Sequence, residues 1–465
     1  MKTEPELGEL REEISRKTAE IVRLIAERNE LAKQVAKAKT KDDLPLEDEG
    51  VEDRLFQMVQ RECERLGVDR EAGARILNIL LLESKRVQGG KTQSAPVITP
   101  MMIASKAREL ERKGEKLIRF DVGEPDFHPP RAVLEACSKA LFGFKTHYTQ
   151  TRGIPVLIES LQKYLEKRYS FGAKENELIV TPGGRYAVYA ALRSLLNEGD
   201  RCVVIEPNWP AYKEVIQFIG ARATTIPTTL EEGWEPSVEK VKESIVSSTK
   251  AMVLSYPANP TGKQISTKLF DELVGVANDH KITIISDEIY TDYSYTECPS
   301  ILKSSAERFI LTASFSKTWA MTGFRVGYAV SSSETISRIA KMQALMVTSV
   351  PEFIQYGAIR ALDAEDEVRA NAEAMRERIE VASHELDKVA EFEHFRPDGA
   401  MYVFPRVKLP GFDASAFTVK VLEQKKVSIS PGVGFGDYPD CFRISLGNSK
   451  ETIAEGIRRL GEALR

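Results

Sequence analysis

Several features that would assign the chain to a common class are missing. Only five cysteines occur in 465 residues, scattered and without a C-x-x-C pair, so we expect neither a disulfide framework nor a metal cluster. Such cysteine usage is typical of a reducing compartment, and we expect a cytoplasmic protein. The N-terminal residues MKTEPELGEL lack the apolar segment of a secretory signal, and no apolar run is long enough for a bilayer.

An excess of one charge is missing as well. The formal net charge is -4, with 29% charged and 42% hydrophobic residues, as in soluble globular proteins, so neither nucleic acid nor membrane is an expected partner. Residues 1–90 carry 17 lysines and arginines against 20 aspartates and glutamates, which argues against a DNA-binding domain. The length itself predicts two or three domains.

The first 88 residues contain no tryptophan or tyrosine, and no proline lies between Pro5 and Pro45. Their apolar residues recur at spacings of three, four and seven: Leu10, Ile14, Ile21, Leu24, Ile25, Leu31 and Val35. This pattern predicts one helix of about 34 residues, ~50 Å long, which needs a partner helix to cover it. Two further helices are predicted near 46–66 and 69–88, so we expect an all-α domain over 1–88.

Residues 89–97 have the composition of a linker, beginning Gly89-Gly90-Lys91. After it, apolar strands alternate with helices, which predicts an α/β domain over 98–465 with a mostly parallel, helix-covered sheet. The clearest strands are Leu178–Val180, Cys202–Ile205, Ala251–Leu254, Ile282–Ile285 and Phe309–Leu311.

The segment SFSKTWAMTGFR, residues 314–325, contains a lysine between hydroxyl side chains. Lysine amines form Schiff bases with carbonyl compounds, of which pyridoxal phosphate (PLP) is the usual one. Ser314 and Arg325 lie close enough in sequence to Lys317 to hold the cofactor's phosphate. The simpler interpretation is a surface loop with an incidental arginine.

Two polar residues follow the strand that ends at Ile285. Ligands bind where strands end in such sheets, so Asp287 is placed to pair with the pyridine nitrogen of PLP. Tyr290, three residues on, is placed to hydrogen-bond the ring's phenolate oxygen. The alternative is an acidic helix start without a ligand.

Four more segments follow or occupy predicted strands. Asn259, in Asn-Pro-Thr-Gly, could donate to the same phenolate or simply form a turn. Gly184 and Arg185 open a helix whose free N–H groups suit a phosphate. Trp209 could stack on a flat ring or pack in the core. Arg443 interrupts an apolar strand, and a buried arginine needs an anion such as a substrate carboxylate.

In this order, the motifs resemble PLP-dependent aminotransferases of fold type I, class I, the aspartate aminotransferase family, over residues 97–465. The resemblance implies a large domain at about 137–360 and a small domain from about 98–136 and 361–465. It implies that Lys317 is the Schiff-base lysine and proton shuttle. The ring would be held by Asp287, Tyr290, Asn259 and Trp209, and the phosphate by Gly184, Arg185, Ser314 and Arg325.

The same resemblance implies the substrate contacts and the assembly. Gly123, within Asp-Val-Gly-Glu-Pro-Asp-Phe, would touch substrate through its backbone, and Arg443 would bind its α-carboxylate. Asn259 and Trp209 would also contact the substrate. Tyr148 matches a tyrosine that reaches the phosphate of the neighbouring subunit, which implies a homodimer.

Charges in the first 88 residues are arranged on helix faces. Arg28 and Lys39 are eleven residues apart, only ~20° around a helix, so they share a face. Arg11 lies ~100° around and ~25 Å along the axis from Arg28, so it would serve the pocket of a partner chain. Two pairs have i,i+4 spacing and thus share a face: Ser84 with Gln88, and Asp48 with Glu52.

Residues 6–88 closely resemble the all-helical, AroQ-type chorismate mutase. The matching segments are Leu10-Arg11-Glu12, Ala26-Glu27-Arg28, Ala36-Lys37-Ala38-Lys39, Pro45-Leu46-Glu47-Asp48, Glu52, Ser84 and Gln88. The resemblance implies that Arg28 and Arg11 of the partner subunit bind the two carboxylates of chorismate. It further implies that Lys39 and Gln88 donate to the ether oxygen, that Glu52 and Asp48 hold the hydroxyl, and that Ser84 lies at the substrate.

One position departs from this second family. The residue before the glutamate is usually arginine and here is Val51, with Arg54 one turn further on as the candidate replacement. We therefore expect a bifunctional enzyme that converts chorismate to prephenate and transaminates prephenate or an aromatic 2-oxo acid, with glutamate or aspartate as donor. The alternative is an aspartate aminotransferase with an inactive helical dimerisation module. The cation of Arg185 would suit the distal carboxylate of either substrate, aspartate or prephenate, so it does not separate these two interpretations.

Overall fold

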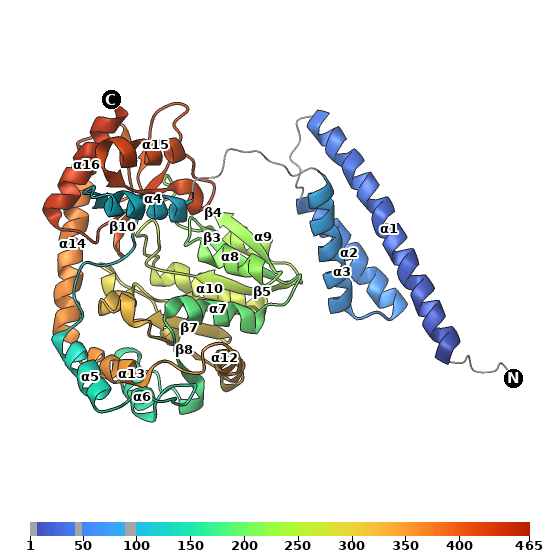
Figure 1. Cartoon of the computed structure of the whole chain (residues 1–465), viewed down its shortest axis with the longest axis horizontal. Helices are drawn as coiled ribbons and strands as arrows, with labels where there is room; N and C mark the ends of the chain where they lie inside the picture. Colours follow the sequence, from blue (N-terminus) through green and yellow to red (C-terminus); the bar gives the residue numbers. More distant parts are fainter. Residues whose placement is uncertain (1–6, 42–48, 89–98) are drawn as a thin grey trace. The chain divides into compact units, whose positions relative to one another are not determined.

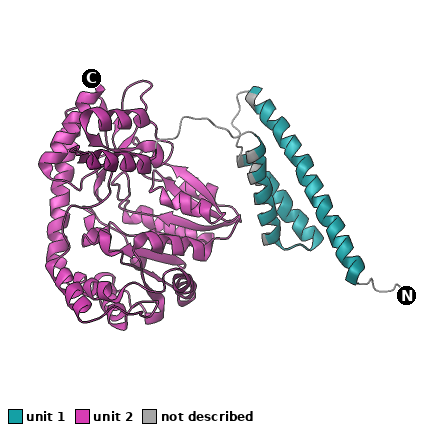
Figure 2. Ribbon diagram, in the orientation of Figure 1, with its two compact units in different colours: residues 1–97 teal, residues 98–465 magenta. Residues whose placement is uncertain are grey.

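The computed structural model describes residues 7–41, 49–88 and 99–465, which fall into two compact units, Met1–Val97 and Ile98–Arg465 (Figure 2). The predicted linker at 89–97 lies outside the described residues. Within the described ranges, no helix is long and apolar enough to cross a membrane, and no histidine, cysteine or carboxylate cluster could hold a metal ion. All five cysteines are described, and each is free.

The described residues of the first unit form three helices, as predicted: α1 (Leu7–Lys41), α2 (Glu49–Leu66) and α3 (Arg70–Val87). The break between α2 and α3 contains Gly67 at φ +68°, and Asp69 caps α3 by accepting from the backbone N–H of Ala72 at 2.9 Å. Helices α1 and α2 both pack on α3. The buried apolar residues of this unit are few and small to medium in size: Ala32, Ala36, Cys63, Leu77 and Leu81.

The second unit is built on a seven-stranded sheet of order β2-β8-β7-β6-β5-β3-β4 (Figure 1). Neighbouring strands are parallel except at β8, which is antiparallel to both β2 and β7, so the predicted mostly parallel sheet is confirmed. The strands are β2 (Leu178–Thr181), β3 (Arg201–Glu206), β4 (Arg222–Pro227), β5 (Thr249–Leu254), β6 (Thr283–Asp287), β7 (Phe309–Ser314) and β8 (Gly327–Ser331).

Side chains alternate between the two faces of this sheet, and both faces are covered by helices. On β5, for example, Ala251 and Val253 face one core while Met252 and Leu254 face the other. One face packs on α7 (Gly184–Leu195), α8 (Ala211–Phe218) and α12 (Ser333–Met346). The other packs on α5 (Arg131–Phe142), α6 (Pro155–Tyr169), α9 (Val238–Ser244), α10 (Thr267–Asp279) and α13 (Glu352–Ala361).

A separate core lies beside the sheet and joins residues far apart in sequence. It combines Phe120 near the start of the unit with residues of α14 (Glu365–Asp387), β14 (Phe442–Ser445) and α16 (Lys450–Leu464). In Figure 1, α14 runs from beside α5 and α13 to the C-terminal elements. Short strands and helices complete this part: α4 (Pro100–Arg112), β1 (Ile118–Arg119), β9 (Phe392–Glu393), β10 (Tyr402–Val403), β11 (Arg406–Val407), α15 (Ala414–Lys420), β12 (Val427–Ser428) and β13 (Ser430–Pro431).

Candidate active sites

The polar residues singled out in the second unit gather at one edge of the sheet. Strands β3, β5, β6 and β7 are parallel, so their carboxyl ends meet there; β2 points the same way because it and β7 are both antiparallel to β8. A cavity of about 610 Å³ lies at this edge. Eleven predicted site residues line it: Gly123, Gly184, Arg185, Trp209, Asn259, Asp287, Tyr290, Ser314, Lys317, Arg325 and Arg443.

Lys317 lies in α11 (Phe315–Thr318), a short helix that follows β7 directly. Its ammonium donates a hydrogen bond to the backbone carbonyl of Gly123. Burial lowers the pKa of Lys317 to about 8. The carboxylate of Glu124 opposes this shift, and three cations add to it: Arg443, Arg325 and Arg185.

Asp287 and Tyr290 lie at the end of β6, facing the cavity. Burial raises the pKa of Asp287 to about 6, although its Oδ2 accepts a 2.7 Å hydrogen bond from the hydroxyl of Tyr212. No cation among the described residues pairs with this carboxylate. The hydroxyl of Tyr290 lies 2.6 Å from that of Tyr402, and burial raises the pKa of both phenols. The cavity therefore contains one carboxyl group that changes charge near pH 6, that of Asp287. It also contains two phenol hydroxyls that stay neutral, those of Tyr290 and Tyr402.

A second cluster surrounds the start of α7. Gly183 has φ +84°, and a Cβ there would strike the guanidinium of Arg325, so only glycine lets that arginine approach the helix N-terminus. Arg325 itself takes the left-handed φ of +54°, which is uncommon for a non-glycine residue. The hydroxyl of Ser314 caps α11 by accepting from the N–H of Ser316 at 3.1 Å. The free N–H groups at the start of α7, the hydroxyls of Ser314 and Ser316 and the guanidinium of Arg325 form a site for a phosphate.

Arg443 projects from β14 into the opposite part of the cavity. Its guanidinium donates to the side-chain oxygen of Asn259 at 3.1 Å and to the carbonyl of Asp121 at 2.7 Å, while Nε has no partner among the described residues. The ring of Tyr402 lies under it, 4.6 Å from the guanidinium carbon. A buried guanidinium held by neutral groups keeps its charge available for an incoming carboxylate.

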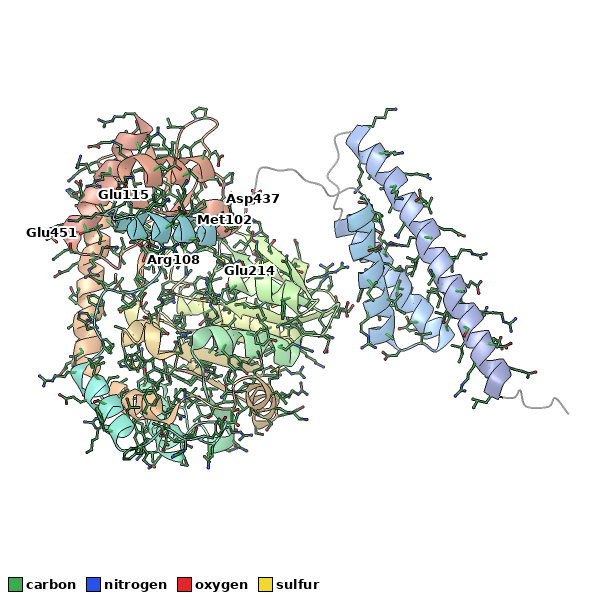
Figure 3. The ribbon with its side chains drawn as sticks, in the orientation of Figure 1. Met102, Arg108, Glu115, Glu214, Asp437 and Glu451 are labelled. Atoms are coloured by element: carbon green, nitrogen blue, oxygen red, sulfur yellow. The ribbon has the colours of Figure 1, made fainter. Side chains whose placement is uncertain are left out.

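Arg185 and Trp209 form a further wall of the cavity. The guanidinium carbon of Arg185 lies 4.7 Å from the centre of the Trp209 ring. Thr99, Pro100 and Met101 line the cavity from the start of α4, and Glu214 lines it from α8. Met102, next to Met101, and Glu214 are labelled in Figure 3.

These residues fit PLP. The buried carboxyl of Asp287 lacks a cationic partner, which a pyridinium nitrogen would supply. The glycine cradle beside Arg325 and Ser314 would hold a phosphate, and Lys317 has the lowered amine pKa that reaction with an aldehyde requires. Arg443 remains for a substrate carboxylate.

Tyr148 is not part of this cavity. Its side chain is 89% exposed, and it does not line the cavity within one chain. Among the lining residues that sequence reasoning missed are three aromatic ones: Tyr212, Tyr402 and Phe435. Tyr212 is one helical turn after Trp209, a spacing that could have indicated it. Tyr402 and Phe435 carry no such signal, because they reach the cavity from two clusters far along the chain: Tyr402 from the core beside the sheet, and Phe435 from a small cluster with Trp234 and Phe404.

In the first unit, Arg28 joins α1 to α3. Its guanidinium donates to the carbonyl of Leu80 at 2.7 Å and to the hydroxyl of Ser84, and burial lowers its pKa. Ser84 is buried, and Gln88 ends α3 with its N–H bonded to the carbonyl of Ser84 at 2.9 Å.

The structure describes the other predicted site residues of this unit only in part. Lys39 is half-buried near the end of α1, whereas Arg11 is exposed near its start. Thus a single chain does not bring Arg11 to Arg28. Asp48 and the side chain of Glu52 lie outside the described residues.

Both units match known protein families. Residues 115–460 match the family aminotransferase class I and II, and residues 10–89 match chorismate mutase type II. These are the families that the sequence motifs resemble, and class I and II aminotransferases use PLP.

Similar proteins cover the second unit. A probable aspartate/prephenate aminotransferase of Aquifex aeolicus is 34% identical over 388 residues, covering 80% of this chain and 96% of that protein. An aspartate aminotransferase of Pyrococcus horikoshii is 34% identical over 369 residues, covering 77% and 94%. The structure of aspartate aminotransferase from Thermus thermophilus with maleate has a TM-score of 0.75 at 31% identity, covering 78% of this chain and 96% of that one.

Proposed function

Since the chain belongs to the class I and II aminotransferases and carries a type II chorismate mutase domain before them, we propose that it is a bifunctional enzyme of aromatic amino acid synthesis. The first unit would convert chorismate to prephenate. The second would transaminate prephenate or an aromatic 2-oxo acid, with glutamate or aspartate as donor. The observation that carries this proposal is the occurrence of both enzyme domains in one chain.

In the second unit, each residue of the cavity has a separate task. PLP, when bound, carries the amino group from donor to acceptor and accepts the electrons of the broken Cα–H bond. Asp287 would pair with its ring nitrogen, while Tyr290 and Asn259 would donate to its phenolate oxygen. Trp209 would lie against the ring. The phosphate would be held by the backbone N–H groups of Gly184 and Arg185 and by the side chains of Ser314 and Arg325, which leaves the guanidinium of Arg185 for substrate.

Lys317 would move the proton. With a pKa lowered to about 8, its ammonium is a stronger acid than that of an ordinary lysine, and a larger share of the amine is neutral near physiological pH. Arg443 would bind the substrate α-carboxylate, which fixes Cα within reach of the Lys317 amine. The carbonyl of Gly123, which accepts from this amine, would keep it on the substrate side of the cavity.

Two cations in one cavity support a dicarboxylate as substrate. Arg443 and Arg185 both line the cavity, and a dicarboxylate would satisfy both. Prephenate and aspartate both meet this requirement. The name of the Aquifex aeolicus relative, a probable aspartate/prephenate aminotransferase, is consistent with either acid.

In the first unit, catalysis would rest on position and charge, without a nucleophile. Arg28 is half-buried and would bind one carboxylate of chorismate, with Ser84 beside it. Lys39 and Gln88 would stabilise negative charge on the ether oxygen, and Asp48 and Glu52 would hold the hydroxyl. Arg11 is too far along α1 to join them, so Arg11 of the partner subunit would complete the site.

A homodimer follows as part of the proposal. Arg11 and Tyr148 are each exposed and each away from the site to which the family resemblance assigns it. One dimer would serve both activities.

The proposal is tested with the purified full-length chain and added PLP. Loss of chorismate absorbance is measured first; aspartate or glutamate is then added and the product identified. Formation of prephenate and then of its aminated product is the expected result. Lys317→Ala should abolish only the second step, and transamination by this variant would contradict the assignment.

A second candidate is an aspartate aminotransferase with an inactive helical module. Val51 favours it, because the family usually has arginine there, and several relatives are named aspartate aminotransferases. It predicts no chorismate turnover and full activity with oxaloacetate.

A further inference from the structure

The short helix α11, residues 315–318, carries Lys317 but is too short to be stable by itself. Contacts from outside must therefore hold its backbone. One such contact comes from a cavity residue, because the hydroxyl of Ser314 accepts from the backbone N–H of Ser316 at the start of the helix. Further contacts come from residues that do not line the cavity.

Two side chains from one segment hold α11, one at the Thr318 side chain and one at the backbone of Lys317. The hydroxyl of Thr318 donates to Oδ2 of Asp292 at 2.7 Å, and the hydroxyl of Tyr293 donates to the carbonyl of Lys317 at 3.0 Å. Asp292 and Tyr293 belong to the 3₁₀ turn Thr291–Tyr293, which directly follows Tyr290. The segment that supplies Tyr290 to the cavity thus also fixes the lysine from behind.

Asp292 is held in turn by Arg168, in the last turn of α6. The guanidinium donates to Oδ1 at 2.5 Å and to the hydroxyl of Tyr164 at 2.8 Å. The side chain of Asp292 is only 12% exposed, so this carboxylate depends on its two donors, Arg168 and Thr318. Loss of either would leave an oxygen of a largely buried carboxylate unsatisfied.

We propose that Arg168, Asp292 and Thr318 are positioning residues for transamination: Arg168 orients Asp292, and Asp292 orients the Lys317 backbone through the Thr318 hydroxyl. None of the three lines the cavity, so all act through Lys317. The inference rests on the proposed aminotransferase function. Its physical basis is that proton transfer requires the amine to lie within hydrogen-bond reach of the reacting atom, so a displacement of about 1 Å is costly.

The test compares Thr318→Val, which keeps the shape but removes the hydroxyl, with Thr318→Ser, which keeps the hydroxyl. Thr418→Val in α15 is the matched control, because Thr418 is also buried and also donates a 2.7 Å hydrogen bond, to the carbonyl of Ala414. In Thr318→Val we expect kcat to fall about 10-fold or more, with KM changed less than about 2-fold. Thr318→Ser should recover most of the rate, and Thr418→Val should match the unsubstituted chain.

A second readout needs no cofactor. In the cofactor-free protein, the pH dependence of Lys317 acylation by acetic anhydride is followed by peptide mass spectrometry. The midpoint should lie near 8, and in Thr318→Val and Asp292→Asn it should rise toward the ordinary 10.5 as the amine gains access to water. The charged groups that face the amine are unchanged in these variants: Glu124, Arg185, Arg325 and Arg443.

The two readouts separate the possible failures. Unchanged kcat and unchanged acylation midpoint in folded Thr318→Val would overturn the inference, as would an equal loss of kcat in Thr418→Val. Absence of transamination in the unsubstituted chain would count against the proposed function instead, and the acylation midpoint would then decide the inference. If Thr318→Val does not fold, the isosteric Asp292→Asn provides the same comparison.

Discussion

At the scale of single residues, charge and burial act in opposite directions on Lys317. Burial and three arginines lower the pKa of its amine, while the Glu124 carboxylate raises it. Glu124 is held in place by the hydroxyl of Thr322, which donates to it. The result is an amine that changes charge near neutral pH, which suits a proton carrier.

We predict that the rate at which cofactor-free protein reacts with PLP rises with pH and levels off above about 8, because the neutral amine is the reactive form. Glu124→Gln removes the one group that raises this pKa, so the midpoint should move below 8. Stopped-flow absorbance measures both. A midpoint near 10.5 in the unsubstituted protein would contradict the burial of Lys317.

In the helical unit, we expect the charge of Arg28 to be essential for activity. Arg28→Ala should reduce chorismate turnover at least about 100-fold, because one half-buried cation would be lost from a site that acts by electrostatics. Arg23→Ala is the control on the same helix, since Arg23 is exposed and pairs only loosely with Glu27 at 3.6 Å. Transamination should be unchanged in both variants. Equal turnover by the two variants would exclude Arg28 from the site.

At the scale of elements, the ends of three strands determine the phosphate cradle. Gly327 begins β8 and pairs with Thr181 at the end of β2 and with Ser314 at the end of β7. A Cβ at Gly327 would lie 2.7 Å from the carbonyl of Ala313 and 3.0 Å from the backbone of Gly183 and Gly184. The close approach of these strands, and thus the cradle, depends on the missing side chain.

Gly327→Ala should therefore destabilise the protein by about 1–3 kcal/mol and weaken PLP binding, because the backbone of the cradle must move. Gly275→Ala in α10 is the matched control. Nothing lies within 4 Å of its Cβ, and alanine in a helix interior should stabilise by roughly 0.5–1 kcal/mol. Urea unfolding and PLP titration of both variants provide the measurements. Undiminished PLP affinity in Gly327→Ala would contradict this account of the cradle.

At the scale of the whole molecule, α1 leaves an apolar stripe uncovered. Seven residues at heptad spacing are 42–66% exposed: Leu7, Leu10, Ile14, Ile21, Leu24, Leu31 and Val35. The helix touches α3 through other residues, among them Ala32 and Ala36. An apolar stripe of this length calls for a second helix, and a second copy of α1 would also bring Arg11 of the partner subunit to Arg28.

We predict a mass of about twice 52.0 kDa by sedimentation. The double substitution Ile14→Glu and Ile21→Glu should abolish chorismate turnover without unfolding the chain, because both residues are exposed within one subunit. Val22→Glu is the control, since Val22 is equally exposed but lies off the stripe. Chorismate turnover retained by the double variant would exclude a shared mutase site.

Much of this protein follows from local sequence. The helix α1, the strands β3, β5 and β6, and the clustering of Asp287, Asn259 and Lys317 were predictable, because hydrophobic period and strand ends are local properties. For the mutase residues, the sequence spacing predicted only which of them share a helix face. Whether Arg11 and Tyr148 reach a neighbouring subunit stays a prediction, as does the division of residues 98–465 into a large and a small domain.

Other features were decided only by tertiary structure. Tyr402, which touches Tyr290 and stacks on Arg443, comes from the core beside the sheet, and no sequence spacing relates it to them. The same holds for Arg168, which lies 124 residues before the Asp292 that it orients. The sequence alone determined which residue types do the chemistry, because strand ends and helix starts expose them to ligands. Tertiary structure alone decided which residues tune and hold them, because burial and long-range hydrogen bonds arise only when distant segments pack together.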